Sequence, residues 1–485
     1  MVLRALLLGM LCLSCLQIVA AEPPRAEVEQ ALLRATKFFR EQVAVQGTYL
    51  WQYSVDLAKR EGEAKASRTQ GWVQPPGTPS IGMAYLQAWH ATTNRYFLEA
   101  ARETAYALIH CQLNSGGWQH SLELDPELRK KIAYREGDSK NGRNVTTFDD
   151  DTTQAALRFL MRADAALEFA DKKIHEAVHY ALGSILKAQY PNGSWAQGYQ
   201  DFPAADKFPI VKADFPSEWS RTWPSAPYSS LYTLNDNNLA TLVETLFEAS
   251  RVYAESNDPQ FSALARDSRQ AAAHVGDFLI LAQMPEPQPA WAQQYNFEMH
   301  PAWARKFEPP AISGGESHGA LRTLLRIHRE TSDKKYLEPI PKALAYLRRS
   351  RLPDGRLARF YELRTNRALY FTREYQLTYD DSDVPTHYAF KIGDQTDRIE
   401  KEYEEVKALK KAQQSQSTPG TRTTGTTRSA ADQVQKIIAA LDERGRWIES
   451  GRLRYHGADY GTTQVVRSAT FVRNMQVLSD YLSSR

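Results

Sequence analysis

Pro191-Asn192-Gly193-Ser194-Trp195 is the stretch that decides the fold, because it is one of four similar stretches that separate helical segments. The others are Gly47-Thr48-Tyr49-Leu50-Trp51, Gly116-Gly117-Trp118 and, without a glycine, Pro289-Ala290-Trp291. Each follows a segment rich in small residues, such as the run from Ala177 to Gln189, which fits a helix with one apolar face. A loop of the same kind therefore recurs between the helical segments of the chain.

Each unit of this repeat has a second predicted helix, with starts near Ser80, Thr152, Asn238 and Ser317 that lie 72, 86 and 79 residues apart. Two helices joined by such a loop cannot bury their apolar faces alone and must pack on neighbouring copies. Helices that alternate inside and outside a closed ring, an α/α toroid with long loops forming a groove, meet this requirement best. The alternative, that tryptophans after glycine are ordinary core anchors, is compatible with the same helical fold.

Length alone suggests about three domains for the 485 residues, but the repeats override that expectation. We predict one helical domain over residues 22–485, beginning with an amphipathic helix over Val28–Ala44. A charged helix over Arg398–Lys411 precedes a Ser-, Thr- and Gly-rich insert at about 413–428, which is expected to be disordered. The last helix is predicted over Val465–Leu482.

Loops are longer in the second half of the chain. Gln200–Tyr232 contains two tryptophans and five prolines, and Asp383–Asp394 is predicted to be extended. Long structured loops on a rigid scaffold are common places for binding surfaces.

The N-terminal residues Met1–Ala21 carry Arg4, an apolar run and a small-residue end before Glu22, which is the pattern of a secretory signal. Its removal would leave Cys111 as the last of three cysteines, so no intramolecular disulfide is expected. No other stretch is long and apolar enough to span a bilayer. The net charge of +3 does not argue for a nucleic-acid partner. We therefore expect a secreted or periplasmic monomer without a membrane partner.

Three consecutive acids, Asp149-Asp150-Asp151, stand directly before a helix whose apolar positions are Ala156, Leu160, Ala163 and Leu167. An aspartate at a helix start is first of all an N-cap, which accepts hydrogen bonds from free backbone N–H groups. A cap needs one carboxylate, and three like charges are costly unless a cation offsets them. Clustered carboxylate oxygens suit a hard divalent ion such as calcium. Both interpretations remain open at this point.

Polar residues recur at the other helix starts, as Asn235-Asp236-Asn237 and as Ser313-Gly314-Gly315-Glu316-Ser317. In a toroid these helix starts converge on one rim. Asp236 could thus complete an oxygen-rich site with Asp149 or Asp150, although each acid taken alone fits a cap.

Three arginines stand beside aromatic or turn residues, namely Arg305, Arg359 and Arg373. Arginines near an acidic site bind carboxylates or phosphates through two parallel hydrogen bonds. The alternative for each one is a surface salt bridge.

Several ordered segments resemble family ten of the polysaccharide lyases, the pectate lyases with an α/α toroid. They are Thr147-Phe148-Asp149-Asp150-Asp151-Thr152-Thr153 to Arg158-Phe159-Leu160, Tyr190-Pro191-Asn192-Gly193-Ser194-Trp195, Leu234-Asn235-Asp236-Asn237, Trp291-Ala292-Gln293-Gln294, Ala304-Arg305-Lys306-Phe307-Glu308 to Ser313-Gly314-Gly315-Glu316-Ser317, and Arg359-Phe360-Tyr361 to Asn366-Arg367. The resemblance runs from about Ser80 to Arg373 and resumes at Phe471-Val472-Arg473-Asn474.

That resemblance implies calcium-dependent anti β-elimination of polygalacturonate, with 4,5-unsaturated oligogalacturonides as products. Arg305 matches the base that removes the C5 proton, and nearby cations are expected to lower its pKa into a useful range. Asp236 matches a calcium ligand, whereas Asp149 matches the acid at the cleavage subsite with Asp150 beside it. All three are expected at the metal. Arg359 and Arg373 match arginines that hold uronate carboxylates.

The sequence departs from the family pattern at two places. The family usually has Asn-Gly where this chain has Asp150-Asp151, a change that bears on calcium affinity. A further substrate arginine, in an Arg-Thr-Gly-Tyr-x-Trp segment, is missing from Pro385-Thr386-His387-Tyr388-Ala389-Phe390. The base and the calcium ligands are retained.

Two other functions fit parts of the pattern. Another enzyme on a helical toroid is one: a terpene cyclase needs Asp-x-Asp-Asp, and an inverting glycosidase needs two opposed carboxylates, for which Glu308 and Glu316 are the candidates. The other is a non-catalytic uronan-binding protein, which the missing arginine favours and the retained Arg305 opposes.

Overall fold

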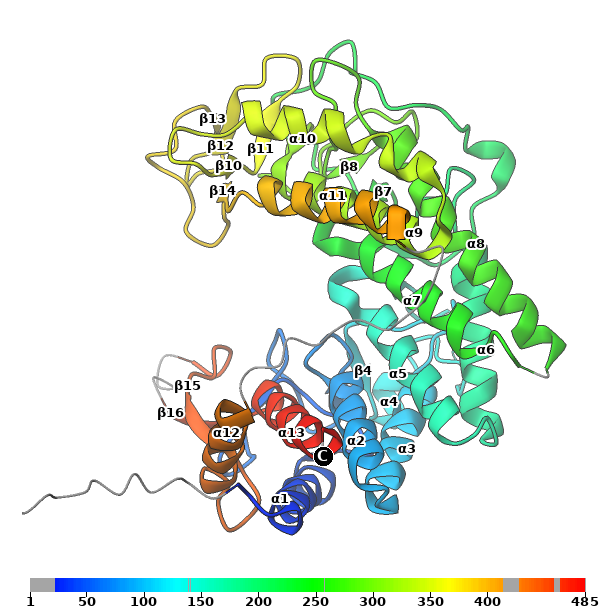
Figure 1. Cartoon of the computed structure of the whole chain (residues 1–485), viewed down its shortest axis with the longest axis vertical. Helices are drawn as coiled ribbons and strands as arrows, with labels where there is room; N and C mark the ends of the chain where they lie inside the picture. Colours follow the sequence, from blue (N-terminus) through cyan, green and yellow to red (C-terminus); the bar gives the residue numbers. More distant parts are fainter. Residues whose placement is uncertain are drawn as a thin grey trace, which may run out of the picture.

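The computed structural model describes residues 22–137, 139, 141–256, 258–412, 427–457 and 463–484. In these residues the long helices pair into six hairpins, each with an outer helix followed by an inner helix (Figure 1). The outer helices are α1 (Arg25–Phe38, continued by a π-helical turn over Phe39–Val43), α3 (Arg95–His110), α6 (Lys172–Lys187), α8 (Pro259–Ala282), α10 (Ile340–Arg349) and α12 (Thr427–Ala439). The inner helices are α2 (Thr78–Thr92), α5 (Thr152–Ala166), α7 (Asn238–Val252), α9 (Gly314–Thr331), α11 (Thr396–Ala412) and α13 (Ser468–Ser483).

The inner helices contact one another in the order α13, α2, α5, α7, α9 and α11. This arrangement confirms the predicted α/α toroid of repeated hairpins. The ring that was predicted to be closed is an open arc, and Figure 1 shows the C-shaped outline with α11 and α13 near its two ends. The last inner helix packs on α1 and α2, at the start of the chain, whereas the strongest contacts of α11 are with α9 and α10.

In the loops of Trp118, Trp195 and Trp291 the tryptophan anchors the hairpin to its own outer helix, whereas Trp51 of the first loop donates to the carbonyl of Gln74. Trp118, Trp195 and Trp291 are buried, and each indole N–H donates a hydrogen bond of 2.8–2.9 Å to a carbonyl near the end of the preceding helix. Trp447 does the same in the last hairpin. These tryptophans thus mark the repeat and also anchor the core, so the repeat interpretation and the core-anchor interpretation are both correct for them.

Glycine is required at the loop of Gly193, whose φ of +93° lies in the left-handed region. A Cβ there would lie 2.1 Å from the backbone oxygen of His274 on the next outer helix. The close approach of loop and helix therefore excludes any side chain at this position.

Short antiparallel strands lead into the inner helices and place their first residues. They are β3 (Gln70–Trp72) with β4 (Ser121–Glu123), β5 (Thr146–Thr147) with β6 (Gly198–Tyr199), and β7 (Tyr232–Thr233) with β8 (Gln294–Tyr295). In β5 and β6, Thr146 pairs with Tyr199, and in β7 and β8, Tyr232 pairs with Tyr295. Each pair ties the start of one inner helix to the loop of the next hairpin.

Two four-stranded sheets flank the arc. One has the order β15 (Ile448–Gly451), β16 (Thr463–Arg467), β1 (Gln52–Ser54) and β2 (Arg60–Glu61). The other has the order β13 (Leu377–Thr378), β12 (Ala368–Phe371), β11 (Phe360–Glu362) and β9 (Ala311–Ser313). The remaining elements are the pair β10 (Leu357–Ala358) and β14 (Lys391–Ile392), the short helix α4 (Pro126–Arg129), and 3-10 turns at Asp149–Asp151, Ala205–Lys207, Asn235–Asn237 and Lys334–Leu337.

The long loop after β6 is held against the second sheet and its approach segment. The Trp303 indole donates to the carbonyl of Ser220 at 2.9 Å, and the Trp223 indole donates to that of Ala304 at 2.8 Å. Arg221 forms an ion pair with Glu362 of β11. This loop is therefore fixed beside the segment that carries Arg305.

The element boundaries need three corrections. The last helix begins at Ser468 because Thr463–Arg467 pairs with β1 and β15 instead. The segment predicted as extended before α11 has regular pairing over Lys391–Ile392 alone. The predicted insert falls largely on residues 413–426, which lie outside the described residues, and residues 427 and 428 begin α12.

The predicted signal at residues 1–21 also lies outside the described residues. In the part of the chain that the structure describes, no helix has the length and apolar character needed to cross a bilayer.

Candidate active site

The two acidic turns are structural copies of one another. Asp150 and Asp151 have φ values of 47° and 62°, and Asp236 and Asn237 have 49° and 57°. Aspartate and asparagine tolerate this left-handed conformation better than most residues. Neither α5 nor α7 has a side-chain hydrogen bond at its cap, so the described turns do not serve as ordinary N-caps.

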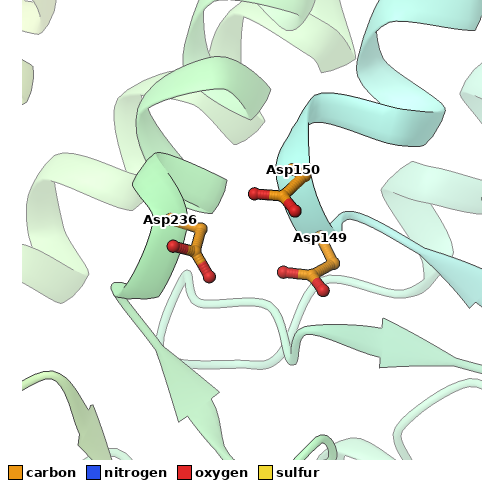
Figure 2. A group of neighbouring side chains, drawn as sticks. All are labelled: Asp149, Asp150 and Asp236. Atoms are coloured by element: carbon orange, nitrogen blue, oxygen red, sulfur yellow. The ribbon is translucent and has the colours of Figure 1, made fainter. Parts of the chain in front are cut away.

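Three carboxylates from the two turns meet in space. Asp149, Asp150 and Asp236 each have an oxygen within 4.8 Å of the others, and Figure 2 shows Asp236 facing the two acids across a short gap. Desolvation and the charges of Asp149 and Asp150 raise the pKa of Asp236 to about 7. Desolvation and the charge of Asp149 also raise the pKa of Asp150. The cluster is therefore short of positive charge, as a cation site is before it binds its ion.

The third acid of the run turns away from the cluster. The Asp151 carboxylate pairs with Arg158 at 2.5 Å, and Arg158 also donates to the hydroxyl of Thr245 at 2.9 Å. Because Asp151 has an arginine of its own on α5, it has a structural role in joining α5 to α7.

Buried polar atoms without a hydrogen-bond partner lie in and beside the two turns. They include Oδ1 of Asp149, Oδ1 of Asn235 and both amide atoms of Gln293. Buried polar groups normally have partners, and a group left without one in the protein needs an ion, a water or a ligand. Carboxylate and amide oxygens are the donors that calcium prefers, so the residues present fit that ion.

Two residues that sequence analysis did not single out complete the cluster. The Gln74 amide donates to Asp150 Oδ2 at 2.8 Å, and His120 Nε2 lies 3.7 Å from Asp149 Oδ2. Both come from the N-terminal side of the chain, in the loops of the first two hairpins. Gln74 and His120 therefore extend the site beyond the acidic turns.

A comparison of the hairpins could have located Gln74. The hydroxyl of Thr78 accepts a hydrogen bond from Tyr49 N, just as that of Thr153 accepts one from Trp118 N. Gln74 stands four residues before Thr78, the same place that Asp149 has before Thr153. The spacing was available in the sequence.

Arg305 lies beside the cluster. Its positive charge lowers the pKa values of Asp150 and Asp236, but desolvation and the neighbouring carboxylates raise them more. Its guanidinium is bound by both oxygens of Glu308, at 2.8 Å from Nε and 2.5 Å from Nη2. The hydrogen bonds that Arg305 donates to the Glu308 carboxylate raise the pKa of Arg305. This direction is opposite to the lowering that sequence analysis expected for a base, because Glu308 was not seen as its partner.

The other two arginines differ in their placement. Arg359 lies 3.6 Å from Glu316, and its guanidinium carbon is 4.5 Å from the centre of the Tyr388 ring. Arg373 stands in the exposed turn after β12 and pairs with Asp383 at 3.3 Å. Arg359 thus shares the Tyr388 ring with Arg305, whereas Arg373 pairs with Asp383.

The two acids of the glycosidase alternative are already engaged. Glu308 is bound by Arg305 and by the hydroxyl of Tyr388, and Glu316 accepts a hydrogen bond from Ser313. An inverting glycosidase needs two free carboxyl groups that face each other, and both of these are occupied by other partners, which disfavours that function.

A hollow lies along the inner helices α7, α9 and α11. Asn237 of the second turn, Gly315 at the start of α9, and Arg322 and Arg326 farther along α9 are among its lining residues. Ile392, Gly393 and Gln395 before α11, and Glu402 within it, also line the hollow. None of Asp149, Asp150, Asp236 and Arg305 lines the hollow, so it does not contain the acidic cluster.

One family model matches about half of the chain. The model of the pectic acid lyase family matches residues 112–357, which include both acidic turns and Arg305. No curated protein matches the sequence.

Two solved structures of a family 10 polysaccharide lyase from Cellvibrio cellulosa are similar to the chain. One is 20% identical, covers 68% of this chain and 97% of its own, and has a TM-score of 0.47. The other, a mutant of that lyase in complex with trigalacturonic acid, is also 20% identical with a TM-score of 0.47, and covers 67% and 98%. A GH76 α-mannanase from Bacteroides thetaiotaomicron is 10% identical, covers 95% and 96%, and has a TM-score of 0.41.

Proposed function

Because the chain belongs to the pectic acid lyase family, we propose that it is a secreted pectate lyase that cleaves polygalacturonate by calcium-dependent anti β-elimination. Family membership makes it a polysaccharide lyase that acts on an acidic polysaccharide. The observation that carries the finer proposal is the meeting of Asp149, Asp150 and Asp236 beside Arg305. An acidic cation site next to an arginine is what elimination from a uronate requires.

The three aspartates would hold the calcium ion, with Gln74 orienting Asp150 through its 2.8 Å hydrogen bond. Calcium supplies positive charge that offsets the carboxylates of the site and of the substrate. Arg359 and Arg373 are proposed to bind further uronate carboxylates in the groove.

Arg305 is proposed to accept the proton from C5 of the uronate. The C5–H bond breaks, its electron pair forms the C4–C5 double bond, and the C4–O bond breaks on the opposite face. The leaving oxygen takes a proton from water, so no second side-chain acid is needed. The products are a new reducing end and a 4,5-unsaturated oligogalacturonide.

We also propose that the protein acts as a monomer outside the cytoplasm and that residues 22–485 form one domain. The apolar run before Glu22 supports export, and the repeat of hairpins along the chain supports the single domain.

The test is ultraviolet absorbance of the protein with polygalacturonate, first with calcium and then with a chelator. Growth of an unsaturated product that stops on chelation is the expected result. Absence of that product on any uronan, while binding persists, would contradict the proposal and favour the non-catalytic binding protein.

Asp236→Ala is expected to raise the calcium concentration that gives the half-maximal rate. Asp236 is the single carboxylate that the second turn adds to the cluster, so its loss removes a ligand. A calcium titration of the rate measures the effect. Asp151→Asn is the matched control, because Asp151 is bound to Arg158 and the variant should titrate like the native protein. An unchanged titration for Asp236→Ala would remove that residue from the metal site.

Calcium binding is expected to weaken as the pH falls below 7. The pKa of Asp236 is raised to about 7, so a proton competes with calcium for this carboxylate in weakly acidic solution. Competition at one such site weakens binding about tenfold at pH 6 relative to pH 8. Calorimetric titration of calcium at the two pH values measures the ratio. Equal affinities would show that the proton does not compete at this carboxylate.

A further inference from the structure

We propose that Glu308 is a positioning residue for Arg305, with Tyr388 holding the Glu308 carboxylate from its other side, so that this ion pair governs when Arg305 can accept a proton. The inference rests on the proposed role of Arg305 in elimination. It concerns residues that lie outside the acidic cluster and that do not reach the cation site.

The geometry of the pair leaves Arg305 one orientation. Glu308 Oε2 accepts from Arg305 Nε at 2.8 Å and from its backbone N at 3.1 Å, while Oε1 accepts from Nη2 at 2.5 Å. A two-pronged contact of this kind fixes the plane of the guanidinium. The Glu308 side chain is 1% exposed, so water does not compete for it. These hydrogen bonds use Nε and Nη2, which leaves Nη1 outside the pair.

Tyr388 holds the carboxylate in place. Its hydroxyl donates to Glu308 Oε1 at 2.9 Å, and its ring packs on Phe307 with centroids 4.7 Å apart. The guanidinium carbons of Arg305 and Arg359 lie 5.7 Å and 4.5 Å from the ring centre. Tyr388 belongs to the segment that lacks the expected substrate arginine, so that segment still contributes to the site through this tyrosine.

The pair has a chemical consequence. A carboxylate in hydrogen-bond contact stabilises the charged form of an arginine, and here it raises the pKa of Arg305. Arg305 must first lose a proton to water before it can take one from C5. Loosening of the contact with Glu308 makes that loss easier. Tyr228 and Tyr388 also interact electrostatically with Arg305 and raise its pKa. The charge of Arg305 in turn lowers the pKa values of Asp150 and Asp236.

The pH dependence of kcat for Glu308→Gln tests the proposal. Glutamine keeps the size and one acceptor oxygen but removes the charge, so the rise of kcat with pH should move toward lower pH by about 1–3 units. KM should change less than kcat. A merely structural role predicts a loss of the same factor at every pH, and that result would overturn the proposal.

Tyr388→Phe should move the same rise in the opposite direction. Phenylalanine keeps the ring between the two arginines and removes one hydrogen bond from the carboxylate. More of the negative charge of Glu308 then acts on Arg305, so the rise of kcat should shift to higher pH, by less than the change in Glu308→Gln. A shift to lower pH, or none, contradicts the proposal.

Glu362→Gln is the matched control. Glu362 is also buried, pairs with an arginine and accepts a hydrogen bond from a tyrosine, with Arg221 and Tyr379 as its partners. Its pair does not include Arg305. The pH position of the rise should stay where the native protein has it.

A measurement without turnover separates this inference from the proposed function. Phenylglyoxal reacts with the neutral form of arginine, and peptide mass spectrometry gives the rate at Arg305. The rate should be several-fold higher in Glu308→Gln than in the native protein and unchanged in Glu362→Gln. Equal rates would overturn the role of Glu308. A native protein that makes no unsaturated product would overturn the proposed function, while these rates would still test the pair.

Discussion

Arg305→Ala is expected to abolish turnover while uronan binding stays mostly intact. Loss of a group that accepts the C5 proton costs a factor of about 10²–10⁴ or more in kcat. Binding should persist because the aspartate cluster and Arg359 remain in place. Ultraviolet assays give the rate, and calorimetry with an oligogalacturonide in the presence of calcium gives the affinity.

Arg251→Ala is the control for this experiment. Arg251 is exposed near the end of α7 and pairs with Glu330 at 2.8 Å, so its loss should leave the rate near the native value. If Arg305→Ala cleaves at near the native rate, the assignment of the base is wrong. If binding is lost together with turnover, Arg305 acts chiefly in holding the substrate.

Trp195→Ala is expected to destabilise the fold by about 3–5 kcal/mol, which is the usual range for removing a large buried aromatic side chain. Trp195 is 1% exposed and fills the core of the third hairpin, where its indole donates to the Ile185 carbonyl at 2.9 Å. Urea unfolding followed by circular dichroism measures the change.

Trp195→Phe separates packing from hydrogen bonding. It keeps an aromatic ring in the core and removes the indole N–H, so we expect a smaller loss, with about 1 kcal/mol of it from the hydrogen bond. A near-native midpoint for Trp195→Ala would show that the loop does not anchor the hairpin.

The sequence predicted the repeating hairpins because their signals are local. A glycine and a tryptophan in one loop mark a tight turn and a core anchor, so helix starts near Thr152 and Asn238 could be placed correctly. The hairpin at Gly355 was missed because Leu357 stands where the other loops have an aromatic residue. The open arc could not be predicted, since it depends on which distant helices meet.

The acidic cluster was predicted in part. The meeting of Asp149, Asp150 and Asp236 followed from the repeat, because equivalent turns lie at equivalent places on the rim. Asp151 leaves the cluster because its carboxylate pairs with Arg158 of α5, although Asp150 has a left-handed backbone as well. The sequence pattern alone does not show which partner each of the three carboxylates contacts.

The environment of Arg305 shows the limit of the same reasoning. Glu308 is three residues away and was considered as a glycosidase acid, not as the partner of the arginine. Tyr388 lies 80 residues from Glu308 in the chain, and its contact depends on how the segment before α11 folds back. The pKa of Arg305 is thus raised by contacts that the sequence pattern did not predict.

The position of the acidic cluster has a mechanical consequence. Asp149 and Asp150 precede α5, whereas Asp236 precedes α7, so a cation held by all three would bridge two consecutive hairpins. In repeat proteins the interfaces between neighbouring repeats contribute much of the stability, and a ligand that binds at such an interface stabilises it further through its binding free energy. The ion would therefore stabilise the contact between these two hairpins. Hydrogen exchange at the starts of α5 and α7 should slow on adding calcium, while exchange in the interfaces farther along the arc should change little.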